Sequence, residues 1–227
     1  MRQLHPSPAH AGSLPSDELL SRLAPIAPVP LRPELLAHQA PDVFALWQAW
    51  EHEIREKRDV PYWAVAWPAA QVMARYFKDH PEWVRGRNVL DLGCGGGVAG
   101  IAAAKSGARR IYGNDIDPSA LEMTARNAAA NAVEVQLDGS NLLERGWPED
   151  TGIILVGDLF YERTESDILF DWLQRARRNG IAVLVADSSR PFGPKTGVQV
   201  LVEEIVQTDW DLEGAVSRKV RLLTLEG

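Results

Sequence analysis

Residues 88–117 read NVLDLGCGGGVAGIAAAKSGARRIYGNDID, and they carry the strongest structural signal in the chain. The apolar run at 88–90 predicts a β-strand that ends on an acid, Asp91, and a glycine loop follows it. Small, mostly apolar residues at 98–105 predict a helix, and 111–115 predict a second strand. The stretch therefore predicts a strand–loop–helix–strand unit of an α/β sheet.

The glycine loop contains three alternating glycines, Gly93, Gly95 and Gly97. Glycine lets the backbone approach a ligand closely, and the start of the following helix presents unpaired N–H groups to an anionic group. Asp115, at the tip of the second strand, can accept hydrogen bonds from both hydroxyls of a ribose. We therefore expect a ligand that has a ribose and a negatively charged group.

Residues 95–100 (GGGVAG) also satisfy the G-x-G-x-x-G pattern of dinucleotide-binding loops. Two features favour a different ligand. Asp91 would place a carboxylate beside a pyrophosphate, which is an unfavourable contact between like charges. The glycines also begin earlier, at Gly93, so that the loop reads D-x-G-x-G-x-G. A carboxylate there suits S-adenosylmethionine, which carries an ammonium group, a carboxylate and a ribose.

The chain has 227 residues, enough for one α/β domain, and 45% of them are hydrophobic. No stretch approaches the roughly 20 apolar residues of a transmembrane helix, and the N-terminus lacks the apolar core of a secretory signal. A net charge of −7 argues against a nucleic-acid partner. Cys94 is expected to be a small residue in a tight turn rather than a nucleophile. We expect a cytoplasmic monomer with no metal, membrane or nucleic-acid partner.

Residues 1–33 contain seven of the fifteen prolines, so we expect them to form a flexible arm. Residues 34–227 are expected to form a single domain. Within it, a helical and aromatic extension at 34–80 precedes the core at 81–227. Two helices are expected at the start of the extension, and Asp42 is expected to cap the second of them.

Three aromatic residues, Tyr62, Trp63 and Trp67, precede a helix that is predicted to begin at Pro68. They could be core residues, or they could line the site and contact the cofactor's sulfonium through cation–π interaction. A third strand is predicted at 133–137, and a polar residue after it could contact adenine. The candidates are Asp138, Ser140 and Asn141.

The apolar run at 153–156 predicts a fourth strand in a buried parallel position. Ligands of open α/β sheets bind beyond the carboxyl ends of the strands. Asp158 and Tyr161 follow this strand, so they are candidates for the residues that meet the reacting group. The other interpretation is that Asp158 only caps the helix expected from about Glu165.

The rest of the chain is expected to complete the sheet. We predict a helix at 166–178, a fifth strand at 181–186, a further helix at 196–203, and two antiparallel strands near 204–207 and 218–225. The expected fold is a Rossmann-like sheet of seven mostly parallel strands, with helices on both faces and an antiparallel C-terminal pair.

Four motifs can be read together: PYWAVAWPAAQVMARYF at 61–77, VLDLGCGGGVAGIAAAKSGA at 89–108, NDIDPSAL at 114–121 and GDLFYER at 157–163. They resemble the class I (seven-strand) S-adenosylmethionine-dependent methyltransferases, and within these the protein-lysine methyltransferases with an Asp-x-x-Tyr motif. The chain most resembles bacterial relatives of the electron-transfer-flavoprotein β-subunit lysine methyltransferase, over roughly residues 25–227. Gly-Cys-Gly at 93–95 is also typical of ribosomal-protein and small-molecule methyltransferases.

The resemblance implies S-adenosylmethionine as the methyl donor and S-adenosylhomocysteine as the product. It implies that Asp158 and Tyr161 are catalytic and receive a lysine of a protein substrate, with the electron-transfer flavoprotein β subunit suspected. The predicted cofactor-binding residues are Trp67, Asp91, Gly93, Cys94, Gly95, Gly97, Asp115, Ile116, Asn141 and Gly157. The predicted substrate-binding residues are Tyr62, Trp63 and Phe160.

A lysine is protonated at neutral pH, so a poorly hydrated aromatic pocket beside the sulfonium would have to favour its neutral form. Asp158 would then orient the amine by accepting a hydrogen bond, more than remove a proton. One alternative is a methyltransferase that acts on a ribosomal protein or a small-molecule amine. The alternative from another class is an NAD(P)-dependent oxidoreductase.

Overall fold

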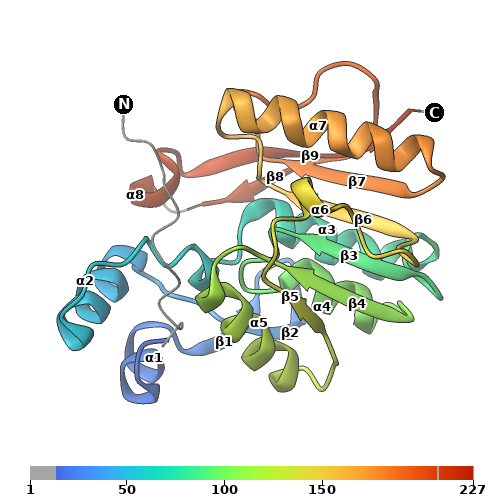
Figure 1. Cartoon of the computed structure of the whole chain (residues 1–227). Helices are drawn as coiled ribbons and strands as arrows, with labels where there is room; N and C mark the ends of the chain where they lie inside the picture. Colours follow the sequence, from blue (N-terminus) through green and yellow to red (C-terminus); the bar gives the residue numbers. More distant parts are fainter. Residues whose placement is uncertain (1–13, 209, 227) are drawn as a thin grey trace.

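A computed structural model describes residues 14–208 and 210–226, and its main sheet has seven strands in the order β5-β4-β3-β6-β7-β9-β8 (Figure 1). The parallel strands are β3 (Asn88–Leu92), β4 (Arg110–Asn114), β5 (Gln136–Asp138), β6 (Ile153–Gly157) and β7 (Ala182–Asp187). β9 (Ser217–Leu225) and β8 (Val198–Gln207) run antiparallel at one edge. The predicted seven-strand sheet with an antiparallel C-terminal pair is confirmed.

Helices cover both faces of this sheet. The helices of the described residues are α1 (Asp17–Leu23), α2 (Val43–Ile54), α3 (Pro68–Asp79), α4 (Val98–Lys105), α5 (Pro118–Ala130), α6 (Leu142–Arg145), α7 (Arg163–Arg178) and α8 (Trp210–Glu213), with 3-10 turns at Tyr62–Ala64 and Pro81–Trp83. Side chains of α3 and α4 pack on one face, and those of α6 and α7 pack on the other. None of the helices in the described ranges has the length and apolar character needed to cross a membrane.

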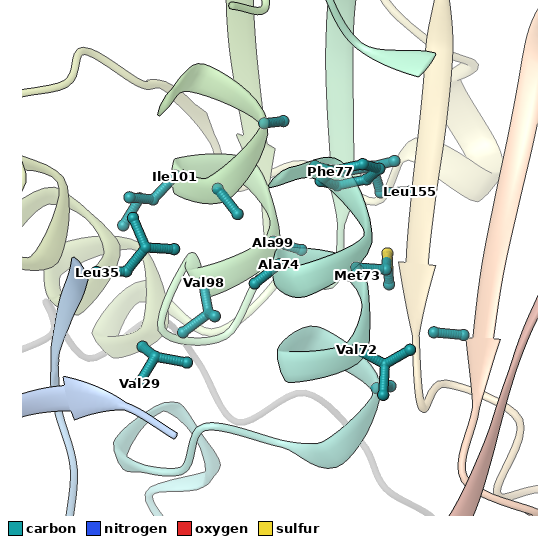
Figure 2. Packing of buried hydrophobic residues seen from close by; sticks show 14 of the residues in the cluster. Val29, Leu35, Val72, Met73, Ala74, Phe77, Val98, Ala99, Ile101 and Leu155 are labelled. Atoms are coloured by element: carbon teal, nitrogen blue, oxygen red, sulfur yellow. The ribbon is translucent and has the colours of Figure 1, made fainter. Parts of the chain in front are cut away.

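The central strand β6 supplies both faces of the core. Successive side chains of a strand point to opposite faces, so Ile153 and Leu155 join the α3–α4 side while Ile154 and Val156 join the α7 side. All four are fully buried, as expected for an apolar run in an internal parallel strand. Figure 2 shows Leu155 beside Phe77 of α3.

The strand order places a switch point between β3 and β6. From β3 the chain adds β4 and β5 on one side, and it then crosses over to add β6 and β7 on the other. Leu92 of β3 is the register partner of both Asn114 and Val156, so the residues that follow these three positions emerge at one edge. Ligands of doubly wound sheets bind at such a switch point, beyond the carboxyl ends of the strands.

The prediction of a flexible arm at 1–33 is wrong for the part that the structure describes, and residues 1–13 lie outside the described residues. Helix α1 buries Leu19 and Leu20 in a cluster with side chains of α2 and α5, and a β-hairpin follows it, formed by β1 (Ile26–Val29) and β2 (Arg32–His38). Pro28 and Pro33 lie inside these strands. A two-stranded sheet has only edge strands, which tolerate proline, so proline content was a poor guide here.

The first of the two helices expected at the start of the extension is also wrong, because residues 32–38 form β2. Leu35 and Ala37 alternate inward on this strand and are buried. Arg32, at its start, donates hydrogen bonds to the carbonyls of Ala74 and Ala102, each at 3.0 Å, and so fixes the hairpin to α3 and α4. The predicted second helix is α2.

The N-cap predicted for that helix is confirmed, because Asp42 Oδ1 accepts a hydrogen bond from the N–H of Ala45 at 2.9 Å. The helix predicted at 196–203 is wrong, since β8 runs through this segment. Val198, Val200 and Val202 are β-branched, and such residues favour the extended chain of a strand.

Candidate cofactor and acceptor site

The glycine loop between β3 and α4 is fixed to the tip of β4. Gly93, Gly95 and Gly97 all have positive φ angles, of 66°, 54° and 76°, which side-chain-bearing residues rarely adopt. The N–H of Cys94 donates to the carbonyl of the last residue of β4 at 2.9 Å, and the N–H of Gly95 donates to Oδ2 of Asp115 at 2.9 Å. A Cβ added at Gly95 would have no atom within 4 Å, so the loop presents open backbone on that side.

Asp91 is buried near the end of β3 and binds the first turn of α4. Its Oδ2 accepts a hydrogen bond from the N–H of Gly100 at 2.8 Å. Burial raises the pKa of Asp91 to about 7, and the hydrogen bond from Gly100 opposes that shift. In dinucleotide-binding loops the N–H groups of this helix turn receive a pyrophosphate. Here a carboxylate of the chain itself takes one of them, which disfavours a dinucleotide ligand.

Asp115 has both carboxylate oxygens fixed by backbone groups. Oδ2 accepts from Gly95 and Oδ1 accepts from the N–H of Asp117 at 3.0 Å. Burial raises the pKa of Asp115, and these hydrogen bonds oppose the shift. An ionised carboxylate has about four lone-pair sites, so each oxygen keeps capacity for a hydroxyl donor. The next residue, Ile116, has 74% of its surface exposed and offers an apolar face beside the loop.

The polar residues after β5 have different roles. The side-chain amide of Asn114 donates to the carbonyls of Asp138 and Ser140, at 2.7 and 2.9 Å, and holds the loop in place. Oδ1 of Asp138 accepts from the N–H of Ser140 at 2.8 Å, and hydrogen bonding to Ser140 lowers the pKa of Asp138. Asn141 caps α6, accepting from the N–H two residues on at 3.2 Å. Asp138 therefore fits an adenine contact better than Asn141 does.

The predicted aromatic residues separate into two environments. Trp63 is only 2% exposed and packs edge-on against Trp50, with ring centroids 5.9 Å apart, so it is a core residue. Its carbonyl oxygen would lie 2.6 Å from a Cβ added at Gly96, so its backbone packs directly on the glycine loop. Tyr62 is 54% exposed and contacts the half-buried Trp67, whose Nε1 donates to the carbonyl of Tyr62 at 3.0 Å.

Asp158 lies at the tip of β6 and is almost completely buried. Its Oδ1 accepts from the N–H of Ser188 at 2.9 Å and from Nε of Arg190 at 3.2 Å, and its Oδ2 accepts from Oγ of Ser188 at 2.8 Å. A longer contact, 3.4 Å, joins Oδ2 to the N–H of Ala69 in the first turn of α3. Burial raises the pKa of Asp158, and Arg190 and Ser188 oppose this shift.

The interpretation of Asp158 as a cap for the following helix is wrong. The N-cap of α7 is Glu162, and its side chain makes no capping hydrogen bond. Asp158 instead joins three segments that are distant in the sequence: the tip of β6, the loop after β7 and the start of α3. Its backbone has a φ of 55°, a conformation that residues with a side chain seldom adopt.

The residues around Asp158 point in different directions. Tyr161 is 61% exposed, whereas Phe160 is 1% exposed and packs in the core with α7. The predicted direct substrate contacts of Phe160 and Trp63 disagree with their burial, because neither side chain reaches the surface. Gly157 faces α3, where a Cβ would lie 3.3 Å from Cε of Met73.

The tip of β6 and the glycine loop are neighbours in space. A Cβ added at Gly93 would lie 2.7 Å from a methyl group of Leu159, the residue after Asp158. The fold therefore brings together the two predicted parts of the site, the glycine loop and the Asp158–Tyr161 segment. Whether the predicted residues bind cofactor and substrate stays a prediction, which the experiments below test.

Sequence reasoning missed the partners of Asp158 in the loop after β7. Arg190 donates to both carboxylate oxygens of Glu213 in α8, at 3.0 and 2.8 Å, and its Cζ lies 5.6 Å from the ring centroid of Trp67. The sequence did contain a signal for these residues, because Ser188 and Arg190 follow a predicted parallel strand just as Asp158 does. The rule that places ligands beyond strand ends applied to β7 as well as to β6.

A pocket of about 350 Å³ adjoins this site through Trp67. It is lined by residues 39–44, 64–68, 71, 207, 208 and 211–213. Asp158 contacts the N–H of Ala69, and Gln71, two residues further along α3, lines the pocket. Within the described ranges, no three His, Cys, Asp or Glu residues are grouped so as to bind a metal.

The family model of the ribosomal protein L11 methyltransferase (PrmA) matches residues 79–155. This segment contains the glycine loop, Asp115 and most of β6. It ends before Asp158, so the match covers the predicted cofactor side of the site and not the acceptor side.

Two curated relatives match a longer part of the chain. The electron transfer flavoprotein beta subunit lysine methyltransferase of Xenopus laevis is 43% identical over 135 residues, which are 57% of this chain and 53% of the relative. The human protein of the same name is 35% identical over 163 residues, which are 70% of this chain and 61% of the relative. The chain thus matches between half and two thirds of the length of these relatives.

Among solved structures, a Pyrococcus horikoshii protein provisionally assigned as an RNA methyltransferase superposes with a TM-score of 0.53 at 16% identity. The match covers 70% of this chain and 84% of the other. At this identity the likeness is one of fold alone. The chain therefore has the fold of class I methyltransferases, and its sequence is similar to those of electron transfer flavoprotein beta subunit lysine methyltransferases.

Proposed function

We propose that this protein transfers a methyl group from S-adenosylmethionine to a lysine of a protein, and that its substrate is the electron transfer flavoprotein β subunit. The observation that carries the methyl-donor part is the bond between Gly95 and Asp115, which joins an open glycine backbone to a carboxylate suited to a ribose. The sequence similarity to lysine methyltransferases that are named for this flavoprotein subunit supports the acceptor.

The residues present fit the cofactor. The backbone from Gly93 to Gly95 would hold its methionine part, Asp115 would bind the ribose hydroxyls, and Asp138 would accept a hydrogen bond from the adenine amine. The exposed Ile116 would cover an adenine face. When bound, S-adenosylmethionine supplies a methyl group on a positively charged sulfur, which is already a reactive electrophile.

The task of the protein is then to present a neutral lysine amine in line with that methyl group. Asp158 and Tyr161 lie beside the glycine loop, at the next strand tip. A lysine has a pKa near ~10.4 in water, so the site must favour its uncharged form. Tyr62, Trp67 and Tyr161 would exclude water from the amine, and Asp158 would accept one of its hydrogens and so orient the lone pair.

A protein substrate fits the character of the chain. The net charge of −7 would favour encounter with a surface that presents lysines. Two large side chains, Tyr62 and Tyr161, are exposed near the site and are available to a protein surface. We further propose that the enzyme is a monomer in the cytoplasm; light scattering of the purified protein would check the first point.

The direct test is to incubate the purified enzyme with purified electron transfer flavoprotein and S-adenosylmethionine, and to map methyl groups by mass spectrometry. We expect methylated lysines on the β subunit and none with the Asp158→Ala variant. Methyl groups found only on small molecules of a cell extract, with none on the flavoprotein, would contradict the protein-substrate assignment.

The match of residues 79–155 to the ribosomal protein L11 methyltransferase model favours a second candidate, methylation of a ribosomal protein. Purified ribosomal protein L11, added in the same assay at equal concentration, separates the two substrates. We expect label on the flavoprotein and not on L11, because the L11 match stops before the Asp158 segment.

An oxidoreductase is the alternative of a different class. Calorimetry distinguishes it from a methyltransferase without any assumption about the acceptor. We expect the protein to bind S-adenosylhomocysteine and not NADH, since Asp91 already occupies a helix N–H that a dinucleotide would need. Binding of NADH with none of S-adenosylhomocysteine would overturn the methyltransferase assignment.

A further inference from the structure

The guanidinium of Arg190 bridges the predicted acceptor site and helix α8. Its Nε donates to Oδ1 of Asp158 at 3.2 Å, and its two terminal nitrogens donate to Glu213 at 3.0 and 2.8 Å. It also lies over Trp67, with Cζ 5.6 Å from the ring centroid. Its side chain is only 16% exposed, so this cation is held on three sides by the protein.

The charges around Asp158 are balanced. Glu213 also accepts from Nε of Arg218 at 3.1 Å, and Asp187 of β7 pairs with Arg221 of β9 at 3.2 Å. Asp158, Arg190, Glu213 and Arg218 thus form one chain of ion pairs, and the pair of Asp187 and Arg221 lies on the neighbouring strands. Helix α3 contributes the N–H of Ala69, and the loop after β6 carries two further titratable side chains, Tyr161 and Glu162.

This balance matters for the acceptor. A buried carboxylate without a partner would hold a lysine as an ammonium ion, because an opposite charge at short distance favours the charged form. An ammonium has no lone pair and cannot be methylated. A carboxylate that already carries its counter-ion can still accept a hydrogen bond, and the weakest existing contact of Asp158 is the one on Oδ2, at 3.4 Å.

We propose that Arg190 is a positioning residue that neutralises Asp158, so that the site orients the lysine as a neutral amine instead of trapping it as an ammonium. This inference rests on the proposed lysine methylation. It gives Asp158 and Arg190 a joint role: Arg190 provides the charge balance and Asp158 provides the acceptor oxygen.

The test is the pH dependence of kcat, measured at saturating substrate, since this profile reports ionisation in the enzyme–substrate complex. In Arg190→Met the uncompensated carboxylate should retain the lysine proton, so the rising limb of the profile should move up by about one pH unit, equivalent to about tenfold slower turnover at neutral pH. Calorimetry in the presence of S-adenosylhomocysteine should show that this variant binds the flavoprotein more tightly than wild type does.

Arg218→Met is the matched control, because Arg218 contacts Glu213 as Arg190 does but makes no contact with Asp158. We expect its pH midpoint to equal that of wild type. Arg190→Lys keeps the charge and loses the two-pronged contact with Glu213, so it should lower kcat without moving the midpoint. The double variant Asp158→Asn, Arg190→Met removes both charges, and its residual turnover should show the wild-type midpoint.

A uniform fall of kcat at every pH in Arg190→Met, with unchanged affinity, would overturn the inference and leave Arg190 with a purely structural role. If Arg190→Met does not fold, the pH midpoints of kcat in Arg190→Lys and in the double variant are each compared with the wild-type midpoint. A shifted midpoint in either variant contradicts the charge-balance inference. Absence of methylated lysine with the wild-type enzyme at every pH would instead overturn the proposed function, and this inference with it.

Discussion

Gly95 and Asp115 are 20 residues apart and are joined by a 2.9 Å hydrogen bond from the glycine N–H to Oδ2 of the acid. Helix α4, which lies between them in the sequence, packs on one face of the sheet, and the bond directly joins the loop after β3 to the residue after β4. The loop and the acid therefore form one preorganised unit. A ligand that pairs its ribose with Asp115 must lie against the open side of Gly95.

The first prediction concerns Asp115→Ala. The variant loses the ribose acceptor and leaves the N–H of Gly95 without its partner. Hydrogen bonds to a charged group contribute about 1.5–3 kcal/mol each, so the affinity for S-adenosylhomocysteine should fall at least tenfold in calorimetry. Asp117→Ala is the control: it removes the N-cap of α5, costing about 1 kcal/mol of stability, and should leave the affinity nearly unchanged. Equal affinity in Asp115→Ala and wild type would remove Asp115 from the ribose site.

A second prediction contrasts two neighbouring glycines. Gly95→Ala adds a methyl group where no atom lies within 4 Å, at a positive φ that costs about 1–2 kcal/mol. The protein should fold, but the methyl group should project into the cofactor site and weaken S-adenosylhomocysteine binding at least tenfold.

Gly96→Ala should affect mainly stability. Its methyl group would lie 2.6 Å from the carbonyl oxygen of Trp63, and backbone cannot move as easily as a side chain. Overpacking of this kind costs about 1–3 kcal/mol. Denaturant unfolding together with calorimetry separates the two variants. The same affinity in Gly95→Ala as in wild type would show that the cofactor does not lie on that side of the loop.

The parts of the fold that the sequence predicted are those set by local patterns. The glycine loop, the alternating core of β6 and the N-cap at Asp42 each depend on residues within one turn or one strand. The hairpin of β1 and β2 was missed because its stability comes from contacts such as Arg32 with α3 and α4, far away in sequence. The proline content of a segment does not indicate whether such long-range contacts form.

The same limit applies to the candidate site. Asp158 was found from its place after a strand, but its partner Arg190 lies 32 residues away and Glu213 lies 23 residues beyond that. The parallel pairing of β6 with β7 brings Asp158 close to Arg190, and the antiparallel pairings of β9 with β7 and β8 bring Glu213 to the same place. The burial of Trp63 and Phe160 likewise depends on α2 and α7 packing over them, which an aromatic residue in a sequence does not reveal.

A third prediction separates turnover from cofactor binding at Asp158. Asp158→Ala removes the acceptor oxygen that would orient the amine and leaves the glycine loop intact, so turnover should be lost while S-adenosylhomocysteine still binds. The variant also leaves Arg190 buried with one partner fewer, and truncating one partner of a buried ion pair can cost about 3–5 kcal/mol. Thermal unfolding must therefore accompany the assay. Unchanged turnover would exclude Asp158 from the acceptor site.

The last prediction uses the pKa of Asp91, which burial raises to about 7. Between the unfolded pKa near ~3.9 and this value, the folded protein binds a proton that the unfolded chain does not. Stability from this group is therefore complete at low pH and is lost as the pH rises through 7. A shift of about three units corresponds to at most about 4 kcal/mol.

Asp91→Asn should remove that dependence, because an amide does not titrate and can still accept the hydrogen bond from Gly100. The measurement is denaturant unfolding of wild type and variant at pH 5 and pH 8. We expect the loss of stability between these two pH values to be smaller in the variant. Asp171→Asn, on the exposed face of α7, is the control and should follow wild type. The same loss in Asp91→Asn and wild type would show that Asp91 is already ionised in the folded protein at pH 5.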